Sequence, residues 1–292
     1  MNQCSLVEIT TNDGIMHQGV YVKPLKASKK AILYIHGLTS AFYHGMALQN
    51  AVVDACIKKG IGYASFNNRG HDFITSGHVI DAYNEKEKSH ITLGAGVEDF
   101  TKSIFDIDAG IRFLKQKGYT SIYLLGHSTG ANKACYYGGT VKDDRVKGVM
   151  LASPISDRLN PTIRYVFIKR IFLKLLIGLG FGDTVWTYLN FFPITPKRAL
   201  SLLEPGSCED VFSYSGKNPS MEVYGNITTP VFILFGEEDE YRDRPIFEIK
   251  KVFDALQNAK KYKSISISNS PHGFDGKEKE FASQVVSWVS GL

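Results

Sequence analysis

The chain has 292 residues, of which 43% are hydrophobic and 22% are charged. This length and composition allow a sizeable buried core and exclude an intrinsically disordered chain. The formal net charge is only +5, and the lysines and arginines are interleaved with acids rather than gathered in a basic block. We therefore expect a globular protein with no nucleic-acid partner.

The four cysteines lie far apart, without the spacing of a disulfide framework or a zinc site. The first residues, MNQCSLVEITTNDG, have neither the basic nor the apolar region of a signal peptide. The longest stretch without a charged side chain runs from Ala31 to Val53 and contains several polar residues, so it does not predict a membrane span. These observations predict a cytoplasmic location.

In chain order, the first predicted element is a hairpin. Apolar and polar residues alternate from Ser5 to Lys23 around the turn signal Asn12-Asp13-Gly14. "KKAILYIHG" is a short apolar run that ends in glycine and predicts a buried strand. A helix from Gly45 to Lys59 follows, then a second buried strand in "IGYASFN" and the loop "NNRGHD".

The middle of the chain predicts a helix, a strand and a second helix. From Val97 to Leu114 the apolar residues recur every three or four positions, and the pattern ends at Lys117-Gly118. "SIYLLG" predicts a strand that runs directly into His127 and Ser128, and "GANKACYYGG" predicts a helix after them. Strands are then expected in "VKGVMLASP", "PVFILFG" and "KSISISNS", with helices from Pro245 to Asn258 and in "EFASQVVSWVSGL".

Strands that alternate with helices predict an α/β protein with a mostly parallel central sheet and helices on both faces. The alternation stops between Pro154 and Met221, where the aromatic-rich segments "TIRYVFIKRIFLKLLIGLG" and "TVWTYLNFFPITPKRALSLL" are both predicted to be helical. We therefore expect a core of residues 1–153 and 222–292, with residues 154–221 forming a helical cap or lid.

Three polar residues follow three predicted strands. Ser128 follows "SIYLLGH", Asp239 follows "PVFILFGEE" and His272 follows "KSISISNSP". The carboxyl ends of parallel strands share one edge of a sheet, which is where active sites of such sheets lie. A serine hydroxyl needs an adjacent base, and a histidine oriented by a carboxylate supplies one. The order Ser, Asp, His predicts a catalytic triad.

Several stretches resemble the α/β-hydrolase superfamily. They are the elbow Gly126-His127-Ser128-Thr129-Gly130, the "HGLTS" loop at His36, "NNRGHD", "GEED" and "SPHGF". The resemblance covers nearly the whole chain, with residues 154–221 as the variable cap. It implies the α/β-hydrolase fold and a Ser128–His272–Asp239 triad. It also implies that the backbone N–H groups of Leu38 and Thr129 form the oxyanion hole. It does not identify the substrate.

The triad acid has alternatives. Other acids in the loop of Asp239 are Glu237, Glu238, Glu240 and Asp243, and Asp157 follows the preceding strand, where some hydrolases of this fold place the acid. We favour Asp239. His36 and His127 are expected to orient loops by hydrogen bonds, and Arg69, His71 and Asp72 resemble a structural loop. His71, Asp72 and His78 lack a ligand-spaced partner and no phosphate-binding loop is present, so neither a metal nor a cofactor is expected.

The sequence thus predicts a serine hydrolase that cleaves small carboxylic esters through an acyl-enzyme intermediate. A thioesterase, lactonase or amide hydrolase with the same triad remains an alternative, as does a noncatalytic ligand-binding or sensor protein on this scaffold. The segment from Ile163 to Leu176 is apolar apart from its cations. It is interpreted as an acyl-binding lid, as helices packed on the core, or as a surface that contacts membrane lipid. No oligomeric state is predicted.

Overall fold

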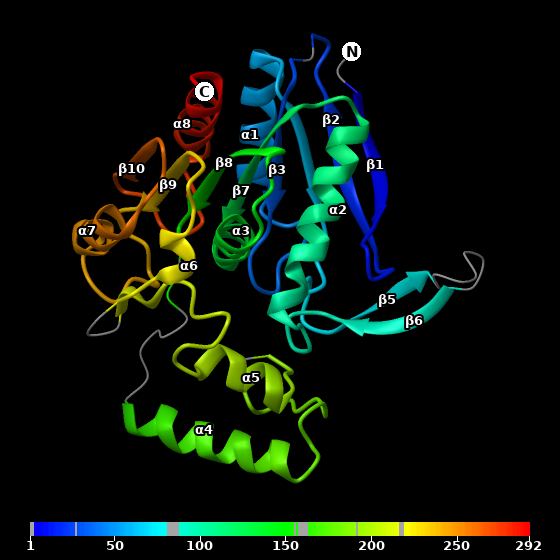
Figure 1. Cartoon of the computed structure of the whole chain (residues 1–292), viewed down its shortest axis with the longest axis vertical. Coiled ribbons are helices and arrows are strands. Elements are labelled where there is room, and N and C mark those ends of the chain that lie inside the picture. The colour runs from blue at the N-terminus through cyan, green and yellow to red at the C-terminus, as the bar shows by residue number, and fades with distance from the viewer. Residues whose placement is uncertain are drawn as a thin grey trace.

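The computed structural model describes residues 3–26, 28–80, 88–154, 156, 163–190, 192–215 and 219–292. Within these ranges an eight-stranded sheet has the order β1-β2-β4-β3-β7-β8-β9-β10 (Figure 1). Its strands are β1 (Gln3–Thr10), β2 (Met16–Lys23), β3 (Lys30–Ile35), β4 (Gly62–Phe66), β7 (Ser121–His127), β8 (Val146–Ala152), β9 (Val231–Gly236) and β10 (Tyr262–Ile267). The β1–β2 and β2–β4 pairs are antiparallel, and the strands from β4 to β10 in this order pair in parallel.

Helices cover both faces of the sheet (Figure 1). One face is covered by α1 (Met46–Lys59) and α8 (Glu278–Ser290), and the other by α2 (Ser103–Gln116), α3 (Thr129–Thr140), α6 (Glu222–Gly225) and α7 (Ile246–Leu256). Side chains alternate between the faces, as a strand requires: Ile32 of β3 packs on the first side and Leu33 on the second. The α/β-hydrolase fold predicted from the sequence is confirmed.

The helix predicted from Val97 begins later in the chain. A short 3₁₀ turn (Phe100–Lys102) precedes α2, and the Asp99 carboxylate accepts the backbone N–H of Thr101 at its start. A side-chain oxygen in this position satisfies one of the N–H groups that a helix start leaves unpaired. The cap at Asp99 therefore sets the helix boundary, and Val97 lies in the loop before it.

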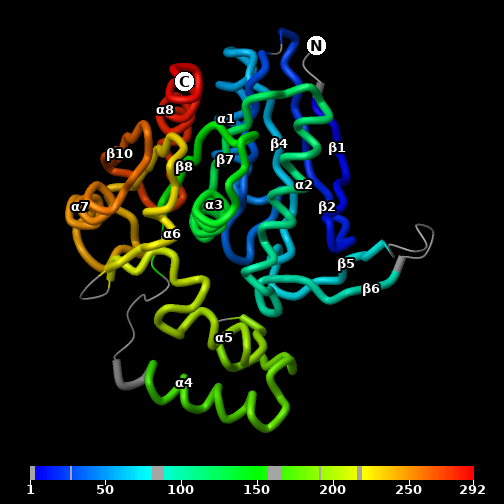
Figure 2. Tube along the Cα trace, viewed as in Figure 1, coloured from blue at the N-terminus to red at the C-terminus, as the bar shows by residue number. Residues whose placement is uncertain are grey.

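A second, two-stranded antiparallel sheet was not predicted. It consists of β5 (Thr75–Ile80) and β6 (Lys88–Leu93), and it extends away from the central sheet (Figure 2). Polar residues and Gly77 interrupt the apolar pattern of β5, so neither strand has the signal of a buried element. A one-residue bridge between Ile15 and Val79 joins this hairpin to the turn after β1.

The segment between β8 and β9 adds no strand to the sheet within the described ranges. Its two longer helices, α4 (Ile163–Gly178) and α5 (Pro196–Leu203), pack on each other at one end of the molecule (Figure 1). A 3₁₀ turn (Ser213–Ser215) follows α5. The prediction of a helix across "TVWTYLNFFPITPKRALSLL" is wrong before Pro196, because Trp186 and Ile194 form a β-bridge and Thr195 caps a helix that begins with Pro196.

The four cysteines are free thiols, with Cys56 and Cys135 buried in the core and Cys4 and Cys208 exposed. Among the described helices, none combines the length and apolar character needed to cross a membrane.

Candidate active site

The turn between β7 and α3 holds Ser128 in a constrained backbone conformation. Its φ is 59° and its ψ is −132°, a region that a non-glycine residue rarely adopts. A Cβ atom on Gly126 would collide with the carbonyl oxygen of Gly130, and one on Gly130 would collide with that of Ile35. The two glycines are therefore required by the close approach of strand and helix. The backbone N–H of Ser128 donates to the carbonyl of Ala152 at 2.9 Å.

His272 and Asp239 are joined by a hydrogen bond of 2.8 Å between Nδ1 and Oδ2. Both side chains are buried. Because a carboxylate only accepts hydrogen bonds, the bond assigns a proton to Nδ1 of His272 and leaves the lone pair of the neutral ring on Nε2. The other oxygen of Asp239, Oδ1, accepts the backbone N–H of Tyr241 at 2.9 Å, which fixes the carboxylate in turn.

The backbone of His272 is fixed by three further residues. Its carbonyl accepts hydrogen bonds from Nε2 of His127 and from Oγ of Ser153, both at 3.0 Å. Its N–H donates to Oε2 of Glu240 at 2.9 Å. Burial, with a smaller contribution from the His272 imidazole, lowers the pKa of His127 to about 4, so His127 is neutral at pH 7 and acts as a donor. The sequence predicted that His127 orients a loop, and it offered Glu240 only as an alternative acid. No sequence signal pointed to Ser153.

The "HGLTS" loop passes directly beside Ser128. A Cβ atom on Gly37 would lie 2.9 Å from Cβ of Ser128 and 3.2 Å from its Oγ, so only a glycine leaves room there. His36 orients the loop: Asn68 N–H donates to its Nε2 at 3.1 Å, and its Nδ1 lies 3.0 Å from the carbonyl of Gly37. Burial lowers the pKa of His36 to about 3 and keeps the ring neutral.

Leu38 connects this loop with the segment between β8 and β9. Its side chain packs against an apolar cluster formed by Ala95, Leu173, Phe192, Ile194 and Ala199. Leu173 belongs to α4 and Ala199 to α5. The residue predicted to supply one oxyanion donor therefore packs against the same apolar cluster as α4 and α5.

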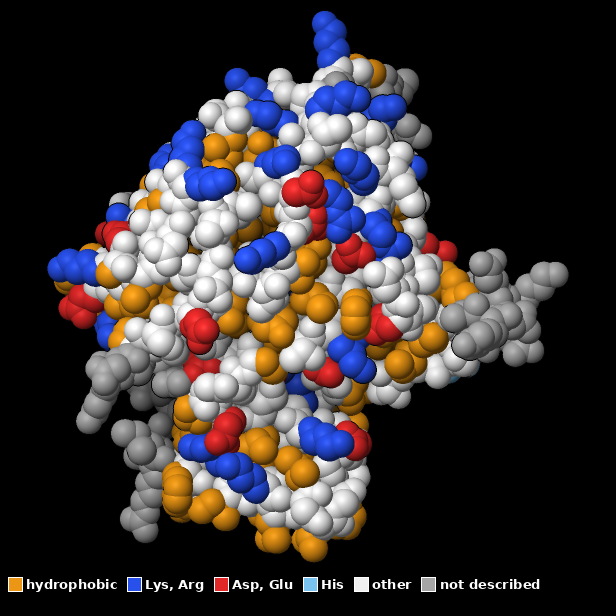
Figure 3. Space-filling model, viewed as in Figure 1, with side chains coloured by type: hydrophobic (Ala, Val, Ile, Leu, Met, Phe, Trp, Pro, Cys, Tyr) orange, Lys and Arg blue, Asp and Glu red, His pale blue; other side chains and the backbone are white. Residues whose placement is uncertain are grey.

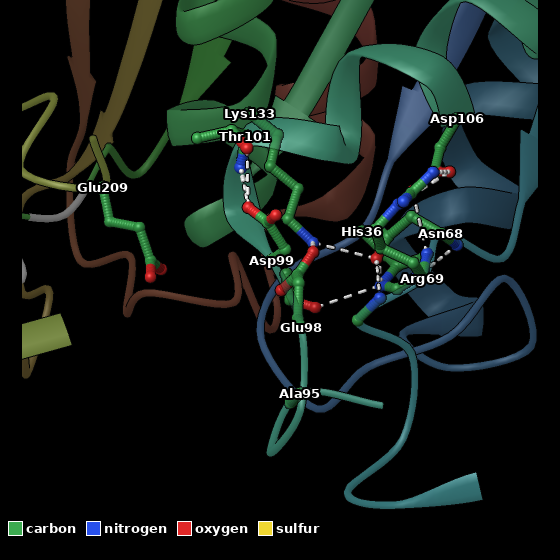
Figure 4. A network of polar contacts seen from close by, with 12 residues as sticks. His36, Asn68, Arg69, Ala95, Glu98, Asp99, Thr101, Asp106, Lys133 and Glu209 are labelled. Atoms are coloured by element: carbon green, nitrogen blue, oxygen red, sulfur yellow. Dashed lines mark hydrogen bonds and ion pairs between the residues drawn. The ribbon is translucent and has the colours of Figure 1, made fainter. Parts of the chain in front are cut away.

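A buried network of charges lies next to the loop (Figure 4). Lys133 of α3 forms an ion pair with Glu98 and donates to Oδ1 of Asn68 at 2.9 Å. Glu98 also accepts a hydrogen bond from Nη2 of Arg198 in α5 at 3.3 Å, and Arg198 forms an ion pair with Glu209 as well. Burial lowers the pKa of Lys133, although Glu98 opposes the shift. Charges taken out of water are costly unless they are paired, so these residues depend on one another.

The "NNRGHD" loop is held by a second set of ion pairs. Arg69 donates hydrogen bonds to both carboxylate oxygens of Asp106, and its Nη1 donates to Oδ2 of Asp13 at 3.0 Å. His71 lies 2.9 Å from the carboxylate of Asp72. These contacts support the structural interpretation of Arg69, His71 and Asp72.

The residues predicted from the sequence meet at one edge of the sheet. Leu38, Ser128 with Thr129, Asp239 and His272 follow the carboxyl ends of β3, β7, β9 and β10. Within the described ranges, Oγ of Ser128 and His272 form no direct hydrogen bond. Hydrogen bonds between catalytic groups often shorten only when substrate binds. Asp157 lies outside the described residues. Among the residues that the structure describes, no cluster of three or more His, Cys, Asp or Glu has a metal-binding arrangement.

This fold, with a serine on a strand-to-helix elbow and an Asp–His pair on the neighbouring strand ends, is that of an α/β-hydrolase. The Pyrococcus furiosus esterase Pf2001 is similar over 100% of this chain and 92% of its own, with 20% identity and a TM-score of 0.64. Est1E from Butyrivibrio proteoclasticus, in a structure with ferulic acid bound, is 16% identical with a TM-score of 0.64 over 97% of this chain and 98% of its own.

Comparisons of sequence place the chain in a family. A family model with the description "Protein of unknown function (DUF1749)" matches residues 85–290, which is more than half of the chain, and the protein belongs to this family. The Mycoplasma genitalium protein named "Putative esterase/lipase 3" is 23% identical over 233 residues, covering 75% of this chain and 72% of its own.

Proposed function

We propose that the protein is a serine hydrolase that cleaves carboxylic esters. The observation that carries the proposal is the 2.8 Å hydrogen bond between Asp239 and His272, formed at the sheet edge where Ser128 has a φ of 59°. A buried Asp–His pair leaves Nε2 of the imidazole as a base, and the elbow presents the hydroxyl that needs one. The names of Pf2001 and of the Mycoplasma relative, which describe esterases, also support this class of reaction.

In the proposed mechanism, Oγ of Ser128 attacks the ester carbonyl carbon while Nε2 of His272 takes the hydroxyl proton. The oxyanion of the tetrahedral intermediate accepts the backbone N–H groups of Leu38 and Thr129, and Asp239 stabilises the imidazolium. The bond between the acyl carbon and the alcohol oxygen then breaks. The alcohol leaves with the proton from His272, and the acyl group stays on Oγ of Ser128. Water, deprotonated by His272, releases the acid and restores Ser128. No cofactor takes part.

Residues 154–221 serve as the cap of this site in our proposal, between core segments 1–153 and 222–292. The contact of Leu38 with the apolar cluster of α4 and α5 supports this role, because it brings the segment to the predicted oxyanion loop. A small ester with an apolar acyl group fits such surroundings. The four free cysteines support a cytoplasmic location.

The experiment is labelling with a fluorophosphonate, followed by peptide mass spectrometry and p-nitrophenyl ester assays. We expect the label on Ser128, and we expect Ser128→Ala to lose both labelling and turnover. Ser121→Ala is the matched control, because Ser121 begins the same strand at its opposite end. If the wild-type protein is not labelled, or if Ser128→Ala keeps its turnover, the proposed mechanism is wrong.

Matched thioester, lactone and amide substrates separate this proposal from its alternatives. A higher kcat/KM on one of them than on the ester would reassign the reaction while keeping the triad. Binding of these compounds without turnover, together with an unlabelled Ser128, would instead indicate a noncatalytic ligand-binding protein.

A further inference from the structure

Helix α4 turns a row of large apolar side chains toward solvent. We call this row the apolar face; it consists of Phe167, Ile168, Ile171, Phe172 and Leu175 of the helix and of Leu179 directly after it, which are 45–62% exposed. They follow one another at helical spacing, while Leu173 and Leu176 are buried on the other side of α4. Apolar side chains gather along the edge of the molecule where α4 lies (Figure 3). A contiguous patch of this kind marks a binding surface, whereas scattered apolar residues do not.

Aromatic residues lie just beyond the end of α4. Tyr188 is 97% exposed, and Trp186 and Phe181, whose rings meet edge to face at 6.3 Å, are both exposed as well. Tyr and Trp rings combine an apolar body with a polar atom, and they favour the headgroup level of a bilayer. The chain directly after the apolar face thus exposes side chains of the type that anchor proteins at a membrane surface.

The charges of this segment are almost all positive. From Ile163 to Glu204 the sequence has six lysines and arginines and two acids, Asp183 and Glu204. Of the cations on α5, Arg198 is buried in ion pairs and Lys197 pairs with Asp183, so the excess of cations lies on α4. Helix α4 itself contains no acid. Glu204 pairs with both Arg170 and Lys174, so one carboxylate faces two cations. The excess of cations beside an apolar face complements an anionic surface.

A second copy of the chain fits these charges less well. In a two-fold dimer through the apolar face, each surface meets its own copy, so the cations of one α4 would face those of the other. Anionic phospholipid headgroups offer the opposite charge, and their acyl chains cover the apolar side chains.

We propose that the apolar face of α4 binds the surface of an anionic phospholipid bilayer, with the helix lying in the plane of the interface. The contact is peripheral: Phe167, Ile171 and Leu175 enter the acyl boundary, while the cations of the helix remain among the headgroups. Binding of this kind does not depend on the proposed esterase activity. Helix α5, which packs on α4, is joined by the ion pair between Arg198 and Glu98 to the loop that precedes α2.

The test is co-sedimentation of the full chain with vesicles of phosphatidylcholine and phosphatidylglycerol, compared with vesicles of phosphatidylcholine alone. We expect binding to the mixed vesicles that weakens as salt is added. The double variant Ile171→Asp/Leu175→Asp is expected to bind about tenfold or more weakly, because it removes apolar burial and adds negative charge. Lys169→Glu/Lys174→Glu is expected to lose the preference for anionic vesicles.

The double variant Leu6→Asp/Phe247→Asp is the matched control, because both residues are exposed apolar side chains outside α4. It should bind like the wild-type protein, and Ser128→Ala should do so too, which separates this proposal from the proposed enzyme activity. Circular dichroism verifies that each variant is folded. The proposal is overturned if the wild-type protein does not bind mixed vesicles, or if Ile171→Asp/Leu175→Asp binds them equally well. It is also overturned if sedimentation shows a lipid-independent dimer that this variant abolishes.

Discussion

The carboxyl edge of the sheet and the α4–α5 segment differ in the side chains that they bury and expose. At the sheet edge, Asp239, His272 and the His272 carbonyl all have partners, and each element could be located from its sequence pattern. In the α4–α5 segment a charge, Arg198, is buried while the apolar face of α4 is exposed. A buried charge is costly unless it is paired, and Arg198 is paired with Glu98 and Glu209. The segment therefore differs from the sheet edge mainly in its exposed apolar face.

The largest expected effect sharpens the assignment at the sheet edge. Asp239→Asn removes the carboxylate that orients the imidazole, so we expect kcat on an ester to fall about 10³–10⁴-fold. Glu238→Gln is the control, because Glu238 is an exposed acid of the same loop, and it should change kcat little. Equal losses in both variants would argue against Asp239 as the triad acid, and a loss in Asp157→Asn alone would transfer the role to Asp157.

The second prediction concerns the buried charge network that connects α5 with α3 through Glu98. Glu98→Ala leaves Lys133 and Arg198 buried without their shared carboxylate, so we expect the free energy of unfolding to fall by about 3–5 kcal/mol. Urea denaturation measures it. The half-exposed pair of Glu204 with Arg170 provides the contrast, since Glu204→Gln should cost no more than about 1 kcal/mol. If the two variants lost similar amounts of unfolding free energy, the buried and the exposed ion pairs would contribute equally to stability, which would contradict the prediction.

The third prediction concerns pH and the two buried histidines beside the site. His36 and His127 have pKa values of about 3 and about 4 in the folded chain, below the ~6.5 of an unfolded chain. As the pH falls below ~6.5 the unfolded state takes up protons first, so stability is full above this value and declines by about 1.4 kcal/mol per pH unit for each histidine. His127→Gln should show a shallower decline between pH 6 and pH 5, and an unchanged slope would contradict the assignment.

The smallest expected effect tests how the loop of His272 is held. Ser153→Ala removes one of the two hydrogen bonds to the His272 carbonyl, while His127 still donates the other. We expect a loss of about 1 kcal/mol in the free energy of unfolding, with a change in kcat of less than about tenfold. A loss of kcat as large as that of Asp239→Asn would mean that Ser153 takes a direct part in the reaction.

The sequence predicted the fold and the residues at the sheet edge because local signals encode them. Most strands of the central sheet, such as β7 and β9, are nearly uninterrupted apolar runs. Ser128, Asp239 and His272 each stand within a few residues of a strand end. The networks of Glu98 and Arg69 were not predictable in this way, because their partners lie far away in the chain and have no shared spacing. The hairpin β5–β6 lacked a strand pattern, and the loop before Pro196 had a helical composition that its β-bridge overrides.

The close approach of Gly37 to Ser128 has a consequence for how this chain tolerates mutation. A library of all residue types at position 37 should yield active clones with glycine alone, because any side chain there would occupy the space beside Oγ of Ser128. Gly178, at the end of α4, has no atom within 4 Å of the place where a Cβ would lie, and a library there should accept many residues. Positions 37 and 178, both glycine in this chain, are thus expected to differ in how many residue types they tolerate.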